Sequence, residues 1–93
     1  MKHRAEQICK DYAKYIGEDV PFDAVVFGKR HLIVTSARKV ILYKLYFENY
    51  GKHSQNEIAE VCGVTKGAVT YAIKVIRDEM RYDSKFRKFI ESL

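Results

Sequence analysis

The chain has 93 residues, of which 47% are hydrophobic and 13% are aromatic, with no tryptophan. This apolar content excludes a disordered chain, and the length predicts one domain, residues 1–93, with a modest core. The formal net charge of +5 favours an anionic partner such as nucleic acid, and no stretch is long and apolar enough for a membrane span.

The excess positive charge lies in the middle of the sequence. Residues 1–28 carry four basic and five acidic side chains, residues 29–53 carry six and one, and residues 54–93 carry seven and six. A segment this basic suits contacts with DNA phosphates. An acidic protein could use it too, whereas a lipid surface fits poorly because we expect no basic amphipathic helix with a bulky apolar face there.

The first half of the chain predicts three helices. Apolar side chains recur at helical spacing from about Arg4 to Ile16, and Gly17 ends that helix. A short helix follows from Pro21 through Phe27 and ends at the next glycine. The β-like tripeptide at residues 32–34 is too short for a sheet, so we expect an extended connector. A helix capped by Ser36 then runs to about Tyr50.

This third helix is apolar nearly all round over Val40–Phe47, which predicts a central, buried helix. Its aromatic residues are interpreted as core rather than as a platform for stacking bases.

The second half opens with the pattern of two short helices joined by a tight turn. Ser54 can cap the first helix while Glu57 bonds back to the cap. Gly63 can take the left-handed conformation of the turn, and Thr65 can cap the second helix. Together these residues predict a helix-turn-helix over about 54–81.

The second of these helices, from about Lys66 to Arg81, has two faces. One is apolar and predicts contact with the core: Val69, Ala72, Ile73, Ile76 and Met80. The other carries Lys66, Thr70, Lys74, Arg77 and Arg81. Since the N-terminal residues of a helix in a major groove meet base edges, we expect base contacts from Lys66, Gly67, Thr70, Tyr71 and Lys74. The alternative is a solvated face without a partner.

A last helix can start at Asp83, whose side chain can cap it. Apolar side chains that would close the core follow at Phe86, Phe89, Ile90 and Leu93.

The cysteines and histidines do not form a reactive pattern. Cys9 and Cys62 lie among apolar helical positions, which predicts buried thiols in a reducing cytoplasm, although a disulfide between them stays open. His3, His31 and His53 are scattered, so we expect no metal and no cofactor. Without a phosphate-binding glycine loop or a local nucleophile arrangement, we also expect no enzymatic activity.

The order of these pieces resembles the C-terminal DNA-binding domain of the bacterial replication initiator DnaA, a relative of the Trp repressor fold. The resemblance covers nearly the whole chain and rests on these phrases: Tyr15-x-Gly17, the basic loop Gly28–Lys39, the aromatic-aliphatic run Val40–Leu45, Ser54-x-x-Glu-Ile58 and Asp83-x-x-Phe86-Arg87. It implies a small all-α domain of five to six helices. It also implies a bacterial or phage-encoded protein of the cytoplasm, associated with the nucleoid.

The resemblance implies further DNA contacts. Arg30 matches an arginine that enters the minor groove, with Lys29 beside it, and Arg38 matches an arginine at the start of the following helix, close to phosphate. A salt bridge or a solvated helix start is the alternative for Arg38. Further backbone contacts are expected from Lys39, Lys52, His53, Ser54 and Gln55.

The chain departs from the family where the second helix begins. The family's base-reading phrase is replaced by Thr65–Ala68, which is one residue shorter, and Gln55-Asn56 replaces a leucine-proline pair. From Gln55 onward the chain resembles a general repressor-type helix-turn-helix instead.

Two functions remain from the sequence. The first is sequence-preferring binding to double-stranded DNA by a stand-alone replication or transcription regulator without ATPase activity. The second is an interaction module that uses the same basic face on an acidic protein or on the replication initiator. The oligomeric state is not predicted.

Overall fold

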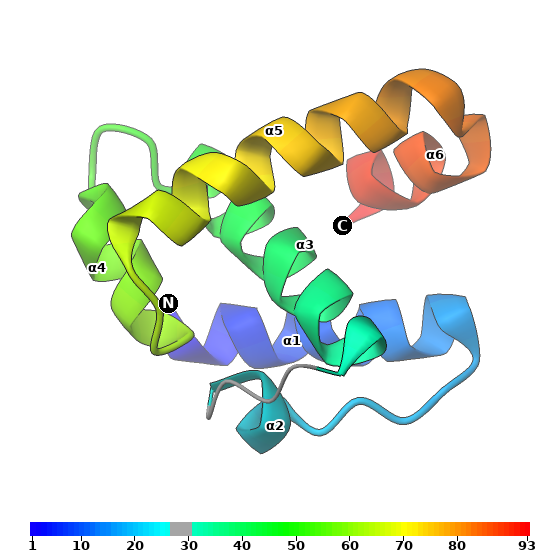
Figure 1. Cartoon of the computed structure of the whole chain (residues 1–93), viewed down its shortest axis with the longest axis horizontal. Helices are drawn as coiled ribbons and strands as arrows, with labels where there is room; N and C mark the ends of the chain where they lie inside the picture. The colour runs from blue at the N-terminus through cyan, green and yellow to red at the C-terminus, as the bar shows by residue number, and fades with distance from the viewer. Residues whose placement is uncertain (27–30) are drawn as a thin grey trace.

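Six α-helices and no β-strand make up residues 1–26 and 31–93, the part of the chain described by the computed structural model (Figure 1). The expected all-α architecture of five to six helices is therefore confirmed for these residues. The helices are α1 (Lys2–Ile16), α2 (Phe22–Val26), α3 (Leu32–Glu48), α4 (Gln55–Val61), α5 (Lys66–Tyr82) and α6 (Ser84–Ser92).

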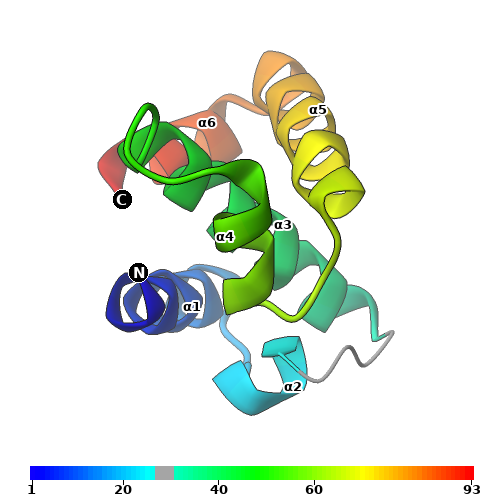
Figure 2. The ribbon, with the colours of Figure 1, turned by 90° about the vertical axis from the view of Figure 1, so that its left-hand side faces the viewer.

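The central element is α3, which contacts α1, α2, α4 and α5. In both ribbon views it passes between α1 and α5 (Figures 1 and 2). Its middle turns are buried on several sides, and Ile41, Leu42 and Leu45 are at most 1% exposed. Burial of each such side chain contributes roughly 1.5–3 kcal/mol, so the placement of α5 depends on this helix.

The start of α3 differs from the expected extended connector at residues 32–34. These residues are the first turn of the helix, and His31 is its cap, with Nδ1 accepting from the Ile33 N–H at 3.4 Å. The Thr35 hydroxyl also donates to the His31 carbonyl oxygen at 2.8 Å. Burial of Val34 in the core outweighs its local preference for extended backbone. Ser36 therefore lies inside the helix and is not its cap.

The aromatic residues at the other end of α3 are only partly core: Tyr43 and Tyr46 are half-buried and pack against it, whereas the expected burial of Phe47 is wrong. The last buried residue of the helix is Leu45, and three further residues follow it. Phe47 is 40% exposed and Tyr50, just beyond the helix, is 72% exposed. A run of apolar residues predicts burial only where neighbouring elements cover it. The last turn of α3 extends beyond the buried core.

The α4–α5 unit begins as expected. The Ser54 hydroxyl accepts the Glu57 N–H at 3.2 Å, and the Glu57 carboxylate accepts the Ser54 N–H at 2.9 Å. This reciprocal pair fixes the first turn of α4. Gly63 has φ +65° in the turn, as its position predicts.

Thr65 occupies the cap position of α5 with extended backbone, but its side chain makes no capping hydrogen bond. The expected side-chain cap is therefore wrong. The backbone starts the helix instead, with the Ala68 N–H donating to the Thr65 carbonyl oxygen at 3.0 Å.

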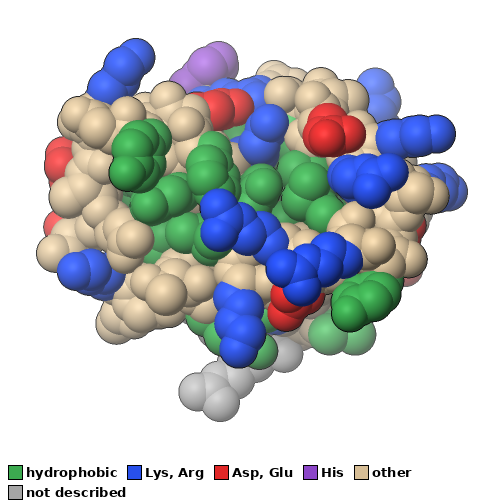
Figure 3. Space-filling model, turned by 90° about the horizontal axis from the view of Figure 1, so that it is seen from above, with side chains coloured by type: hydrophobic (Ala, Val, Ile, Leu, Met, Phe, Trp, Pro, Cys, Tyr) green, Lys and Arg blue, Asp and Glu red, His purple; other side chains and the backbone are tan. Residues whose placement is uncertain are grey.

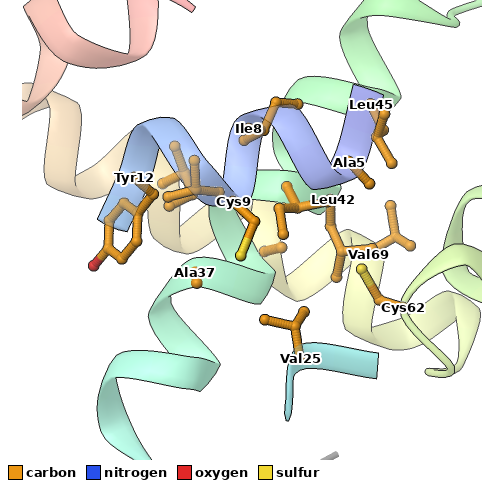
Figure 4. Packing of buried hydrophobic residues seen from close by; sticks show 14 of the residues in the cluster. Ala5, Ile8, Cys9, Tyr12, Val25, Ala37, Leu42, Leu45, Cys62 and Val69 are labelled. Atoms are coloured by element: carbon orange, nitrogen blue, oxygen red, sulfur yellow. The ribbon is translucent and has the colours of Figure 1, made fainter. Parts of the chain in front are cut away.

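The thiols of Cys9 and Cys62 are buried, as the sequence predicted, and they form no disulfide with each other. Figure 4 shows both among Val25, Leu42 and Val69 in the core. Loss of solvent raises the pKa of the Cys62 thiol to about 12, so this group stays protonated and acts as a small apolar side chain.

The α6 helix covers the end of the core next to α5. The Asp83 carboxylate accepts the Phe86 N–H at 3.0 Å, which confirms the expected cap. Phe86 and Ile90 are buried, and Phe89 and Leu93 pack on the core from its edge.

Within residues 1–26 and 31–93, each helix is too short or too polar to cross a lipid bilayer.

Candidate nucleic-acid interface

The cationic stripe of α5 faces solvent along its whole length. The side chains of Lys66, Thr70, Lys74, Arg77 and Arg81 are all exposed, whereas Val69, Ala72 and Ile76 are buried. Lysine and arginine side chains gather over this face, with hydrophobic side chains reaching the surface between them (Figure 3). The helical wheel drawn from the sequence therefore describes the orientation of α5 correctly.

Two more of the expected base-contacting residues lie at the N-terminal end of the same helix. Gly67 is in its first turn, and the Tyr71 ring is 58% exposed one turn later. These two positions flank the stripe on the side of α3, where the Lys39 Nζ lies 5.4 Å from the centroid of the Tyr71 ring. The cation and the ring are mutually attractive at this distance.

A groove separates the start of α5 from α3 on this side. Its volume is about 290 Å³, and its walls are apolar except at the cationic residues. The lining residues are Thr35, Arg38, Lys39, Leu42, Val64, Ala68 and Tyr71.

A hydrogen bond joins the two helices of the α4–α5 unit at their exposed edge. The Thr70 hydroxyl donates to the Gln55 Oε1 at 3.3 Å. With its oxygen used in this way, the Gln55 amide presents its N–H donors to the outside. Gln55 is thus positioned by Thr70 with its amide N–H groups available to another acceptor.

The turn before α4 adds further charge. Lys52 and His53 are exposed, and the His53 Nδ1 lies 3.2 Å from the Glu57 carboxylate. Hydrogen bonds from Ser54 and His53 lower the pKa of the Glu57 carboxyl, so it remains ionised. The Ser54 hydroxyl is exposed but already accepts the capping bond, which leaves its own proton for an outside acceptor.

Arg38 is not at the start of a helix, which corrects the position implied by the resemblance. Because α3 begins at Leu32, Arg38 lies in its second turn and is only 8% exposed. Its Nε donates to the Val25 carbonyl oxygen at 2.9 Å and so ties α3 to α2. The buried Arg38 guanidinium therefore stabilises the fold through this hydrogen bond. We do not include Arg38 in the candidate nucleic-acid interface.

Two further expected DNA contacts in the basic loop, Lys29 and Arg30, lie outside the described residues.

The sequence did not predict three of the contacts that shape this surface. They are the Gln55–Thr70 bond, the approach of Lys39 to Tyr71, and the position of Arg77 over the Phe47 ring. Each joins residues from different helices, and helical spacing within one segment carries no information about them.

Comparison of the chain with protein-family models, with curated proteins and with solved structures finds no match. The function is therefore inferred from the site itself. Among residues 1–26 and 31–93, no three histidine, cysteine or acidic side chains come together as metal ligands.

Proposed function

We propose that this protein binds double-stranded DNA through a helix-turn-helix formed by α4 and α5, with the N-terminal half of α5 in the major groove. One observation carries the proposal: a helix that exposes Lys66, Thr70 and Lys74 along one face of its N-terminal half follows a capped helix and a glycine turn. A groove-reading helix requires this arrangement, because its first turns must meet base edges while positive charge lies near the phosphates.

The contacts follow from the positions on α5. Lys66, Gly67, Thr70, Tyr71 and Lys74 would face the base edges, with Thr70 and Tyr71 supplying sequence preference. Gln55 lies on one side of this helix, beside Thr70, with Lys52 and His53 just before it in the sequence, and Lys39 lies beside Tyr71. These residues would contact the two phosphate backbones that border the groove.

Gly67 supports this assignment because the fold does not require a glycine there. Its φ is not positive, and a Cβ built on it would meet nothing closer than the Thr65 Oγ1 at 3.8 Å. Glycine within a helix costs up to about 1 kcal/mol relative to alanine. Close approach of the helix to a DNA backbone or base edge is a reason to accept that cost.

Gly67→Ala is expected to separate stability from binding. The free energy of unfolding of the variant should be unchanged or higher by up to about 1 kcal/mol, because alanine favours the helix. Its affinity for a bound duplex should nevertheless fall, because the new methyl group intrudes on the close contact. Urea unfolding and fluorescence anisotropy with a labelled duplex measure the two effects. Unchanged affinity would remove Gly67 from the interface.

The proposal is tested by selecting bound duplexes from a random pool. A shared sequence motif is expected, and the affinity for it should fall steeply as salt rises from 50 to 200 mM, by about 10-fold for every two phosphates contacted. Failure to enrich any duplex, with no salt-dependent binding, would refute the proposal. Retention of an acidic protein by the same surface would then favour the interaction-module alternative.

The role we propose is that of a regulator of replication or transcription that acts by occupying DNA sites. No catalytic step is part of this proposal.

A further inference from the structure

A connected set of aromatic rings lies at the C-terminal end of α3 and in the turn after it. Ring centroids are 4.8 Å apart for Tyr43 and Phe47, 5.0 Å for Tyr46 and Phe47, and 5.8 Å for Tyr46 and Tyr50. We call these four residues the aromatic edge. Their exposure rises along the chain, from the half-buried Tyr43 and Tyr46 to Tyr50 at 72%.

Positive charge borders the aromatic edge. The Arg77 guanidinium of α5 lies 5.2 Å from the centroid of the Phe47 ring, and the exposed Lys52 follows Tyr50 in the same turn. The acidic neighbour Glu48 is neutralised by Arg4, which donates three hydrogen bonds to it at 2.7 to 3.2 Å. The aromatic edge therefore combines exposed rings with two cations, Arg77 and Lys52, that are in none of the ion pairs of the described residues. This positive charge favours an anionic partner.

The charge distribution excludes a second copy of this chain as a good partner. In a symmetric contact through the aromatic edge, Arg77 and Lys52 would approach their counterparts, and like charges held close together are destabilising.

A single strand of DNA fits both features of the edge. Unpaired bases expose flat π-faces that stack on aromatic rings and on arginine, and the phosphates pair with the neighbouring cations. The bases of a duplex are stacked on one another and cannot offer these faces. The aromatic edge would therefore discriminate for unpaired DNA, unlike the face of α5 that we assign to the duplex.

The two surfaces use different parts of α5: the proposed duplex-reading residues lie in its N-terminal half, and Arg77 lies in its C-terminal half. The cationic stripe spans about 22 Å from Lys66 to Arg81 at a rise of about 1.5 Å per residue. The base-contacting residues that we propose end at Lys74, three residues before Arg77, so Arg77 is assigned to the aromatic edge. We propose that the aromatic edge, together with Arg77 and Lys52, binds the unpaired bases of single-stranded DNA beside the duplex site.

The test uses the full chain and a fluorescently labelled 15-nucleotide oligothymidine. We expect the wild-type protein to bind this strand and the double variant Phe47→Leu, Tyr50→Leu to bind it at least 10-fold more weakly, because leucine keeps apolar bulk but cannot stack. Tyr82→Leu is the matched control, since Tyr82 is 87% exposed and lies outside the aromatic edge. This control should bind as wild type does, and thermal unfolding should show that all variants are folded.

Affinity for a duplex distinguishes this proposal from the preceding one. The double variant should keep its duplex affinity within about twofold, whereas Lys66→Glu should lose duplex binding and keep most oligothymidine binding. The proposal is overturned if wild type does not bind oligothymidine, if the double variant binds it unchanged, or if both variants lose both ligands equally. Binding of a polyglutamate peptide in place of oligothymidine would also overturn it, in favour of an acidic protein partner.

Discussion

Gly63→Ala is expected to destabilise the protein by about 3 kcal/mol or more, the largest stability effect at any glycine of the described chain. Two costs add at this position. The φ of +65° is unfavourable for alanine by about 1 kcal/mol. A Cβ there would also lie 2.7 Å from the carbonyl oxygen of Val26, a separation that forces backbone to move.

The consequence extends beyond the turn. Val26 ends α2, and the preceding carbonyl of Val25 accepts the buried Arg38 guanidinium at 2.9 Å. A displaced α2 would weaken that bond, which costs roughly 1–3 kcal/mol when a buried partner is left unsatisfied. Chemical denaturation followed by circular dichroism measures the loss.

Gly51→Ala provides the control for this prediction. Its φ is +80°, but no atom lies within 4 Å of the added Cβ. It should therefore show the backbone cost alone, about 1 kcal/mol. If both variants lost the same stability, the close approach of the α4–α5 turn to α2 would not contribute.

The double reversal Lys66→Glu, Lys74→Glu is expected to reduce duplex affinity by 100-fold or more at low salt. Both side chains are exposed on the stripe of α5, so the change replaces two attractions to DNA by two repulsions. The plot of log affinity against log salt should also become shallower by about two. Stability should change little, since both side chains are exposed and an acidic residue at position 66 is favourable at the first turn of the helix.

Arg87→Glu, Lys88→Glu on α6 is the matched control for net charge, because both side chains are exposed there. It changes the total charge by the same amount on another helix. A small effect in the control and a large one on α5 would support a defined site. Equal losses would mean that net charge alone attracts DNA and that α5 is not the reading helix.

Short sequence patterns correctly predicted the features that depend only on residues close together in the sequence. The capping pair of Ser54 and Glu57, the left-handed Gly63 and the cap at Asp83 all involve residues within a few positions of one another. The two faces of α5 follow in the same way from helical periodicity. These features position the proposed reading face, and the sequence predicted them correctly.

Local signals misled at α3. The tripeptide at residues 32–34 favours extended backbone by itself, yet it is helical because Val34 completes the core. Phe47 also fits the pattern of a core residue, yet it is exposed because the helix extends past its last buried residue, Leu45. In both cases contacts with other helices decide the outcome.

From the sequence alone came the helical character of this protein, the capping pair of α4, the glycine turn after it, and the orientation of the cationic stripe, because each depends on interactions within about one or two helical turns. The tertiary structure alone decided that Arg38 is buried against α2, that Gln55 meets Thr70, and that the aromatic edge is exposed beside Arg77. Those contacts join residues from 13 to 30 positions apart, and which of them form depends on how the helices pack around α3.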